Sequence, residues 1–193
     1  AYNDGKLYVA DSNLGLIGRI KLHDDHDCDE DSDESAGQNV PEVWNNDPLL
    51  KSLNPSPFPS ANGLQLFDDE IYVSVSTRGH VVAIPINWDG SSGPVRVHAM
   101  AGLDDFAFDK EGNMYAGTNA SNMFLLITPA GVVHTLLTLA DGLDGPTSAA
   151  FGVKNNKKWV YIANGAFPPF QGQTPRRPSI MRLYIGTNGE PRP

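Results

Sequence analysis

The chain has 193 residues, of which 40% are hydrophobic and 19% are charged, and this balance is typical of a folded domain and not of a disordered segment. No apolar run approaches the roughly 18 residues of a membrane-spanning helix, and the first residues show no signal-peptide pattern. Eight of the 23 acidic side chains lie within residues 24–34, so the remaining 15 nearly balance the 14 Lys and Arg. Without a basic surface, we expect no nucleic-acid binding, and we expect no membrane partner.

The first predicted strands are residues 7–13 (LYVADSN) and 16–22 (LIGRIKL), which are rich in β-branched, aromatic and aliphatic side chains. Residues 23–39 follow as an acidic loop insertion that contains Cys28, the single cysteine, so no internal disulfide is expected. Alternating Asp residues in this insertion resemble the start of a calcium loop, but the glycine and the closing Glu of such a loop are missing, which favours a solvated loop. Residues 45–63 are rich in Pro and Asn, and we expect both segments to be long loops on one face, between the first and second blades described below.

Three segments of similar pattern then follow one another, starting at Asn62, Asp104 and Thr147. Each contains a strand, a polar turn, a second strand ending in small or polar residues, and a third strand; the first two segments add a fourth strand. This pattern recurs about every 40 residues, as it does in β-propellers. The sequence therefore predicts an all-β fold, a β-propeller of four-stranded antiparallel blades.

The two ends of the chain fit incomplete blades. The opening segment matches the second and third strands of a blade and lacks the innermost strand, and the final blade ends after its third strand. We therefore expect a single propeller domain, residues 1–193, that covers about four blades, two of them incomplete. On this interpretation the chain is the C-terminal portion of a longer propeller that lacks its N-terminal blades, or another chain or fragment completes the ring.

Polar residues begin the predicted innermost strands, namely Asn62, Asp104 and, in the third repeat, Thr147 and Ser148. Innermost strands run in the same direction around the central channel of a propeller, so residues at equivalent positions converge at one end of the axis. Carboxylate and amide oxygens gathered there would suit a hard cation such as Ca²⁺ or Mg²⁺. The alternative is that Asn and Asp only form turns at these positions.

Four stretches of the sequence resemble the regucalcin and gluconolactonase family of six-bladed propellers: PSANGLQLF, GLDDFAFDKEGNMYAG, GPTSAAFG and WVYIANG. The chain is most similar to a fungal branch of this family, over residues 7–186. The resemblance implies six blades in the full propeller and activity on lactones or phosphoesters. It also implies a divalent cation in the channel, with Ca²⁺ as the expected ion, held by a Glu, an Asn and an Asp. The Asn falls on Asn62 and the Asp on Asp104, whereas the Glu has no counterpart here.

Asp105 departs from the family pattern, which usually has Gly after the metal-binding Asp. In the leading hypothesis, a lactonase-like hydrolase, the cation polarises a carbonyl, and Asp104 and Asp105 divide the roles of ligand and general base. Some fungal relatives act as metal-independent pericyclases that catalyse hetero-Diels–Alder reactions in terpenoid biosynthesis, and this is the alternative activity; Asn62, Asp104 and Ser148 would then polarise a substrate by hydrogen bonds. A propeller that only binds other molecules is a third interpretation.

The remaining candidates concern the substrate and the compartment. We expect Ser148, Phe167 and Phe170 to contact a small-molecule substrate, the two Phe residues from a loop at the channel mouth. Asn119 begins the only N-glycosylation sequon, Asn119-Ala120-Ser121, which functions only in a secreted protein. The compartment therefore stays open, with secretion as one option.

Overall fold

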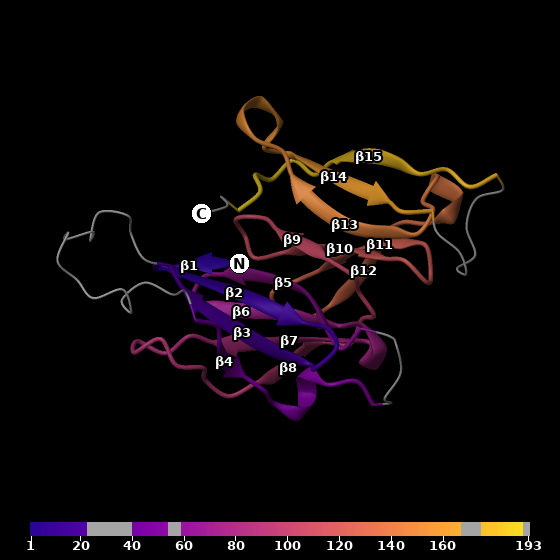
Figure 1. The fold of residues 1–193 in the computed structure, drawn as a ribbon. Helices are drawn as coiled ribbons and strands as arrows, with labels where there is room; N and C mark the ends of the chain where they lie inside the picture. The colour runs from indigo at the N-terminus through magenta and orange to yellow at the C-terminus, as the bar shows by residue number, and fades with distance from the viewer. Residues whose placement is uncertain (23–39, 54–58, 167–174, 191–193) are drawn as a thin grey trace, which may run out of the picture.

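The computed structural model describes residues 1–22, 40–53, 59–166 and 175–190, which form four antiparallel sheets (Figure 1). Each sheet is built from strands that are consecutive in sequence, and three sheets have four strands while the last has three. The only helices among the described residues are 3₁₀ turns: η1 (Pro48–Leu50), η2 (Ser76–Arg78), η3 (Leu139–Asp141) and η4 (Lys154–Asn156). None of these turns has the length and hydropathy that a membrane crossing requires. The all-β prediction is confirmed.

The strands of each sheet run in order from the inside of the molecule to the outside. The first sheet contains β1 (Tyr2–Asn3), β2 (Lys6–Asp11), β3 (Leu16–Lys21) and β4 (Glu42–Asn45). The second contains β5 (Ala61–Phe67), β6 (Glu70–Val75), β7 (His80–Pro85) and β8 (Arg96–Ala99). The third contains β9 (Phe106–Phe108), β10 (Met114–Thr118), β11 (Met123–Ile127) and β12 (Val133–Leu137), and the fourth contains β13 (Pro146–Phe151), β14 (Trp159–Asn164) and β15 (Ser179–Tyr184).

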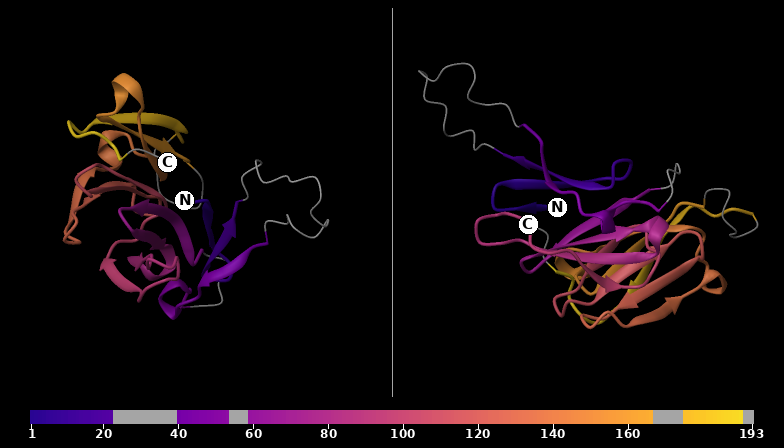
Figure 2. Two further views of the ribbon diagram at one scale, coloured as in Figure 1. Left: turned by 90° about the vertical axis from the view of Figure 1, so that its left-hand side faces the viewer. Right: turned by 90° about the horizontal axis from the view of Figure 1, so that it is seen from below.

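The four sheets are arranged like a fan in chain order around a common axis (Figure 2). The innermost strands of successive sheets lie next to one another, since β9 contacts both β5 and β13. Sheets that stack in this way, each with its first strand at the axis, are successive blades of a β-propeller. The fold class predicted from the repeat is therefore confirmed, with four blades in this chain.

Three hydrophobic clusters fill the three spaces between neighbouring sheets. Successive side chains of a strand point to opposite faces of its sheet. Accordingly Val73 of β6 belongs to the cluster shared with the first sheet, whereas its neighbour Tyr72 belongs to the cluster shared with the third. In β10, Met114 packs toward the second sheet and Tyr115 toward the fourth. The two middle sheets are thus buried on both faces, which explains the nearly continuous apolar runs in β6 and β10.

Two expectations about the first blade are wrong. Its innermost strand is present as β1, two residues that pair with β2 through Tyr2 and Asn3. The acidic insertion, residues 23–39, lies outside the described residues, but it separates β3 from β4 of one sheet and not the first blade from the second. Because β4 crosses the sheet between the insertion and residues 45–60, these segments leave from opposite ends of the blade and not from one face. The sequence pattern missed β4 because it follows the acidic insertion and has only one buried residue, Trp44.

The polar turn between β9 and β10 is built around Asp109, a fully buried carboxylate. One of its oxygens accepts hydrogen bonds from the backbone N–H groups of Glu111 and Asn113, each at 2.9 Å, and the other accepts one from the hydroxyl of Tyr115 at 3.1 Å. These bonds satisfy the charge inside the protein. The turn predicted from the sequence DKEGN is confirmed, and its first carboxylate has a structural role.

Gly63 allows the second and third sheets to approach each other closely at the axis. A Cβ atom at this position would lie 2.6 Å from the carbonyl oxygen of Asp104 and 2.8 Å from the Cα of Asp105. Backbone atoms cannot move aside as a flexible side chain can, so any larger residue would push these segments apart.

We predict that Gly63→Ala lowers the free energy of unfolding by about 1–3 kcal/mol, the usual cost of overpacking. Gly18→Ala in β3 is the matched control, since its Cβ would meet only atoms at the ordinary distance of 3.8 Å. Urea denaturation of both variants provides the measurement. Equal stability of the two variants would show that the close approach at Gly63 does not constrain the fold.

Candidate functional site

The polar residues at the starts of the innermost strands lie where the β-ladders are irregular. The pairing of β5 with β6 shifts register between Ala61 and Leu64, so Asn62 lies in a bulge. The pairing of β13 with β14 shifts in the same way between Pro146 and Ser148. Bulges redirect side chains that a regular strand would point elsewhere, and they are common beside active sites. Local backbone geometry therefore brings polar side chains to the axis.

The segment before β9 is held from both sides by neighbouring sheets. The hydroxyl of Ser74, in the second sheet, donates a hydrogen bond to the carbonyl oxygen of Asp104 at 2.6 Å. The backbone N–H of Asp105 donates to the carbonyl oxygen of Thr147, in the fourth sheet, at 3.0 Å. Residues 104 and 105 thus connect three sheets, and the positions of both carboxylates are fixed by the backbone.

Asn62 and Asp104 are in direct contact, as the sequence predicted. The side-chain amide of Asn62 donates to one carboxylate oxygen of Asp104 at 2.6 Å and also contacts the hydroxyl of Ser76 at 3.1 Å. The amide of Asn119, at the end of β10, donates to the other oxygen of Asp104 at 3.0 Å. Asp104 is therefore held between two amides that come from two different sheets.

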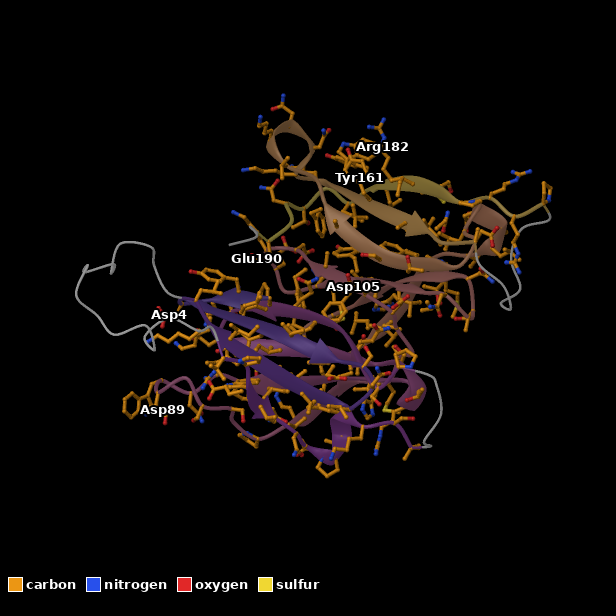
Figure 3. All side chains as sticks on the ribbon, viewed as in Figure 1. Asp4, Asp89, Asp105, Tyr161, Arg182 and Glu190 are labelled. Atoms are coloured by element: carbon orange, nitrogen blue, oxygen red, sulfur yellow. The ribbon has the colours of Figure 1, made fainter. Side chains whose placement is uncertain are left out.

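Asp105 faces a different set of partners. Its carboxylate accepts a hydrogen bond from the hydroxyl of Ser148 at 3.0 Å and lies 3.5 Å from the amide nitrogen of Gln65, at the limit of a hydrogen bond. Asp105 lies in the centre of the molecule, where the sheets converge (Figure 3). The two adjacent carboxylates thus belong to two small clusters, one around Asp104 and one around Asp105.

Burial raises the pKa of Asp104 above its ordinary value of 3.8, and the neighbouring charge of Asp105 raises it further. The hydrogen bonds from Asn62 and Asn119 act in the opposite direction, because both amides stabilise the charged form. Desolvation is the largest of these effects. A half-buried carboxylate with a raised pKa at a channel axis is typical of a functional site.

Sequence reasoning missed Asn119 and Ser76 as site residues. Asn119 was considered only as a glycosylation acceptor, yet its side-chain nitrogen contacts Asp104, so this contact and a glycan would compete for one atom. The repeat held the missing signal, because Ser76 and Asn119 both follow the second strand of a blade at the same register. Phe167 and Phe170, predicted to contact the substrate, lie outside the described residues.

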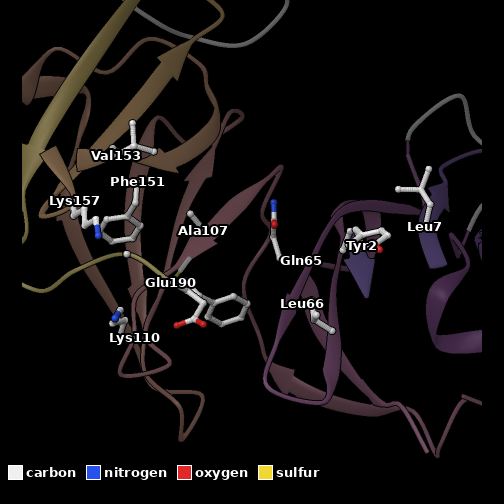
Figure 4. A pocket seen from close by; sticks show the side chains of 14 residues that line it. Tyr2, Leu7, Gln65, Leu66, Ala107, Lys110, Phe151, Val153, Lys157 and Glu190 are labelled. Atoms are coloured by element: carbon white, nitrogen blue, oxygen red, sulfur yellow. The ribbon is translucent and has the colours of Figure 1, made fainter. Parts of the chain in front are cut away.

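A cavity of about 530 Å³ lies along the innermost strands on the Asp105 side of the pair. Gln65, which approaches Asp105, lines this cavity together with Ala107, Phe108 and Phe151, and Gln65 points into the space between Ala107 and Tyr2 (Figure 4). Lys157 and Glu190 add charged groups at its edge. The cavity is therefore mainly apolar, with a few polar groups, as small-molecule sites usually are.

The donor set around Asp104 fits a hard divalent cation better than a soft one. It offers one carboxylate, the amides of Asn62 and Asn119, and the hydroxyl of Ser76. The positions of oxygen and nitrogen in an Asn amide are assigned from the surrounding hydrogen bonds. A half-turn of each amide would direct its oxygen, and not its nitrogen, toward a cation. Among the described residues, no three side chains of His, Cys, Asp or Glu come together as a metal site. A donor set of oxygens without sulfur or imidazole is the kind that Ca²⁺ prefers, whereas Zn²⁺ sites usually contain Cys or His.

Solved structures of other proteins share this fold. A luciferin-regenerating enzyme superposes with a TM-score of 0.66 at 17% sequence identity, over 96% of this chain and 60% of that protein. The calcium-binding protein regucalcin from Agrobacterium tumefaciens gives 0.62 at 11% identity, over 97% of this chain and 59% of that one. A protein assigned as a gluconolactonase gives 0.61 at 12% identity, over 92% and 48%.

No family model and no curated protein sequence matches the chain. At these identities the structural similarity establishes the β-propeller fold. The solved structures that share this fold include regucalcin-like and gluconolactonase-like propellers. The chain spans between 48% and 60% of the length of these three proteins. Activity, metal and substrate must therefore be argued from the site itself.

We predict that Asp104→Asn stabilises the protein relative to wild type by an amount that grows as the pH rises. A raised pKa means that the folded protein holds this proton more tightly than the unfolded chain, so wild-type stability falls as the pH rises above 3.8. The variant lacks this penalty. Thermal unfolding between about pH 4 and about pH 7 measures the difference.

Asn119→Ala is the companion variant, because it removes a donor that stabilises the charged form of Asp104. Its stability should fall more steeply with rising pH than that of the wild type. A difference between Asp104→Asn and wild type that stays constant across this pH range would contradict the raised pKa.

Proposed function

We propose that the protein is an enzyme that hydrolyses a lactone or ester in a small organic substrate, with a divalent cation, Ca²⁺ as the preferred ion, held by Asn62 and Asp104. The observation that carries the proposal is the 2.6 Å contact between these two side chains, which come from neighbouring blades and meet at the axis. The shared fold with proteins described as a calcium-binding regucalcin and as a gluconolactonase supports it.

Asp104 supplies the one negative charge in the amide-rich cluster, beside the hydroxyl of Ser76; Asn62 and Asn119 would supply neutral oxygens after a half-turn of their amides. When bound there, a divalent cation polarises a carbonyl group and lowers the pKa of water. Asp104 is suited to the role of ligand because two amides fix its carboxylate in position. Asn62 lies in the bulge of β5 and Asn119 in the turn that follows β10, and their hydrogen bonds hold the cluster together before a substrate arrives.

Asp105 is the group suited to accept a proton. As water adds to the carbonyl carbon, Asp105 takes one proton from it; the ring or ester C–O bond then breaks, and the leaving oxygen recovers that proton, which yields a hydroxy acid or an acid and an alcohol. The hydroxyl of Ser148 orients the carboxylate by its 3.0 Å hydrogen bond. The proposed reaction requires a substrate that reaches both clusters, and the adjacent positions of Asp104 and Asp105 keep the clusters next to each other on the backbone.

We predict that Asp104→Asn lowers kcat/KM for lactone hydrolysis by about 100-fold or more and weakens Ca²⁺ binding, since it removes the only carboxylate of the amide-rich cluster. Asp105→Asn should lower kcat by a similar factor while Ca²⁺ binding changes little. Calorimetric titration with Ca²⁺ and a pH-stat assay of lactone opening provide both measurements. Asp69→Asn, in an exposed turn, is the matched control.

A metal-independent pericyclase is the second candidate, and one observation favours it. Both carboxylate oxygens of Asp104 already accept hydrogen bonds from amides, so the cluster is complete without a cation. Such a cluster could hold and polarise the carbonyl of a dienophile while the apolar cavity brings the two reacting partners together. Activity toward a diene and dienophile pair that survives a chelator, with no Ca²⁺ binding, would replace the hydrolase proposal. A protein that binds small molecules but turns over neither class would be a binding propeller.

A further inference from the structure

A groove of about 410 Å³ lies between the second and third sheets. One part of its lining is the connection from β8 to β9, residues 100–103, and the other part comes from the third sheet. The third sheet contributes the turn between β10 and β11, together with Val133 and Thr135 of β12. These two side chains point to the same face because side chains alternate along a strand. The groove is separate from the cavity on the Asp105 side, because the two share no lining residue.

The groove begins at the candidate site. Ser76 and Asn119 line it, and these two side chains contact Asn62 and Asp104, respectively. A molecule with its reacting group at Asp104 can therefore extend into the groove without crossing the wall of a blade. This continuity makes the groove the direct extension of the site on the Asp104 side.

Beyond this polar end, apolar side chains share the groove with the hydroxyls of Thr118, Ser121 and Thr135, of which the first two bond each other at 2.7 Å. Leu103 and Leu125 are buried, with 2% and 4% of their surfaces exposed. Met100 and Val133, by contrast, are 70% and 38% exposed, although both are apolar. Exposed apolar side chains that gather in a concave place beside a polar cluster are typical of a ligand site.

We propose that this groove binds an apolar chain of the substrate. This inference rests on the proposed hydrolase and defines its substrate class: a lactone or ester that carries an aliphatic chain on a carbon next to its ester group, and not a polyhydroxylated sugar lactone. Sugar hydroxyls placed along Leu103 and Val133 would lose water without gaining partners. Each methylene of an aliphatic chain buried there should instead tighten binding by about fourfold.

The four methionines allow a direct test, since Met100 and Met123 line the groove and Met114 and Met181 do not. With ¹³C-methyl methionine in the protein, octanamide should shift the signals of Met100 and Met123 and leave those of Met114 and Met181 in place. Octanamide carries an apolar chain and is not an ester, so binding is observed without turnover; acetamide, which lacks the chain, is the control ligand. Absence of shifts at Met100 and Met123, or equal shifts at all four, would overturn the proposal.

A comparison of the hydrolysis rates of two lactones tests the same groove. It distinguishes the proposal about the groove from the proposal that the protein is a hydrolase. Wild type should hydrolyse γ-octalactone with a kcat/KM about tenfold or more above that for γ-butyrolactone. Val133→Asp should remove this preference and keep the rate on γ-butyrolactone, whereas the matched variant Val132→Asp, at an exposed position outside the groove lining, should keep both.

The outcomes are distinguishable. If neither lactone is opened but octanamide shifts Met100 and Met123, the hydrolase proposal fails and the groove remains an apolar ligand site. If gluconolactone is opened faster than γ-octalactone and octanamide causes no shift, the hydrolase stands and the groove proposal fails.

Discussion

The site depends on the close backbone approach of residues 104 and 105 to the two neighbouring blades. Gly63 leaves room for this approach on one side, since its missing Cβ would lie 2.6 Å from the carbonyl oxygen of Asp104. Thr147 fixes the other side through its hydrogen bond with the N–H of Asp105. Because three sheets meet at this segment, its geometry is set by the packing of whole blades, and the hydrophobic clusters between the blades hold it in place.

This arrangement gives two adjacent carboxylates different environments. Asp104 lies between the amides of Asn62 and Asn119, and Asp105 approaches Gln65 and Ser148. The amide cluster opens into the groove between the second and third sheets, whereas Gln65 faces the cavity along the innermost strands. One backbone segment therefore lies between two concave regions, and each carboxylate is joined to one of them through a side chain that lines it, Asn119 for Asp104 and Gln65 for Asp105. The division suits a reaction in which one acidic group binds and its neighbour transfers a proton.

The charged form of Asp104 lowers the stability of the folded protein. Desolvation disfavours its charged form, so the folded protein would be more stable with a neutral residue there at neutral pH. Asp109, also a buried carboxylate, has no such exposure to a channel and is satisfied by its own turn and by the hydroxyl of Tyr115. Asp109 thus organises a turn, whereas Asp104 is held at the channel axis at a cost in stability.

The sequence by itself determined the β-propeller. Residue alternation and the polar turns identify each strand, and the repeat of about 40 residues identifies the blade, because both depend on local chemistry that every blade repeats. The repeat also predicted that Asn62 and Asp104 lie close together, since equivalent positions of the innermost strands converge at one end of the axis. The sequence missed β1 and β4, because neither carries an apolar pattern, whereas β9 was predicted although it has only three residues, all of them buried.

Only the tertiary structure decided which further side chains complete the two clusters. The contact of Asn119 with Asp104 forms inside the third blade, and that of Ser148 with Asp105 depends on a bulge and on the distance between neighbouring sheets. The sequence treats Asp104 and Asp105 as one acidic pair, whereas packing directs their carboxylates to separate clusters. The groove likewise arises between two blades, and no local pattern encodes the space that remains when two sheets pack together.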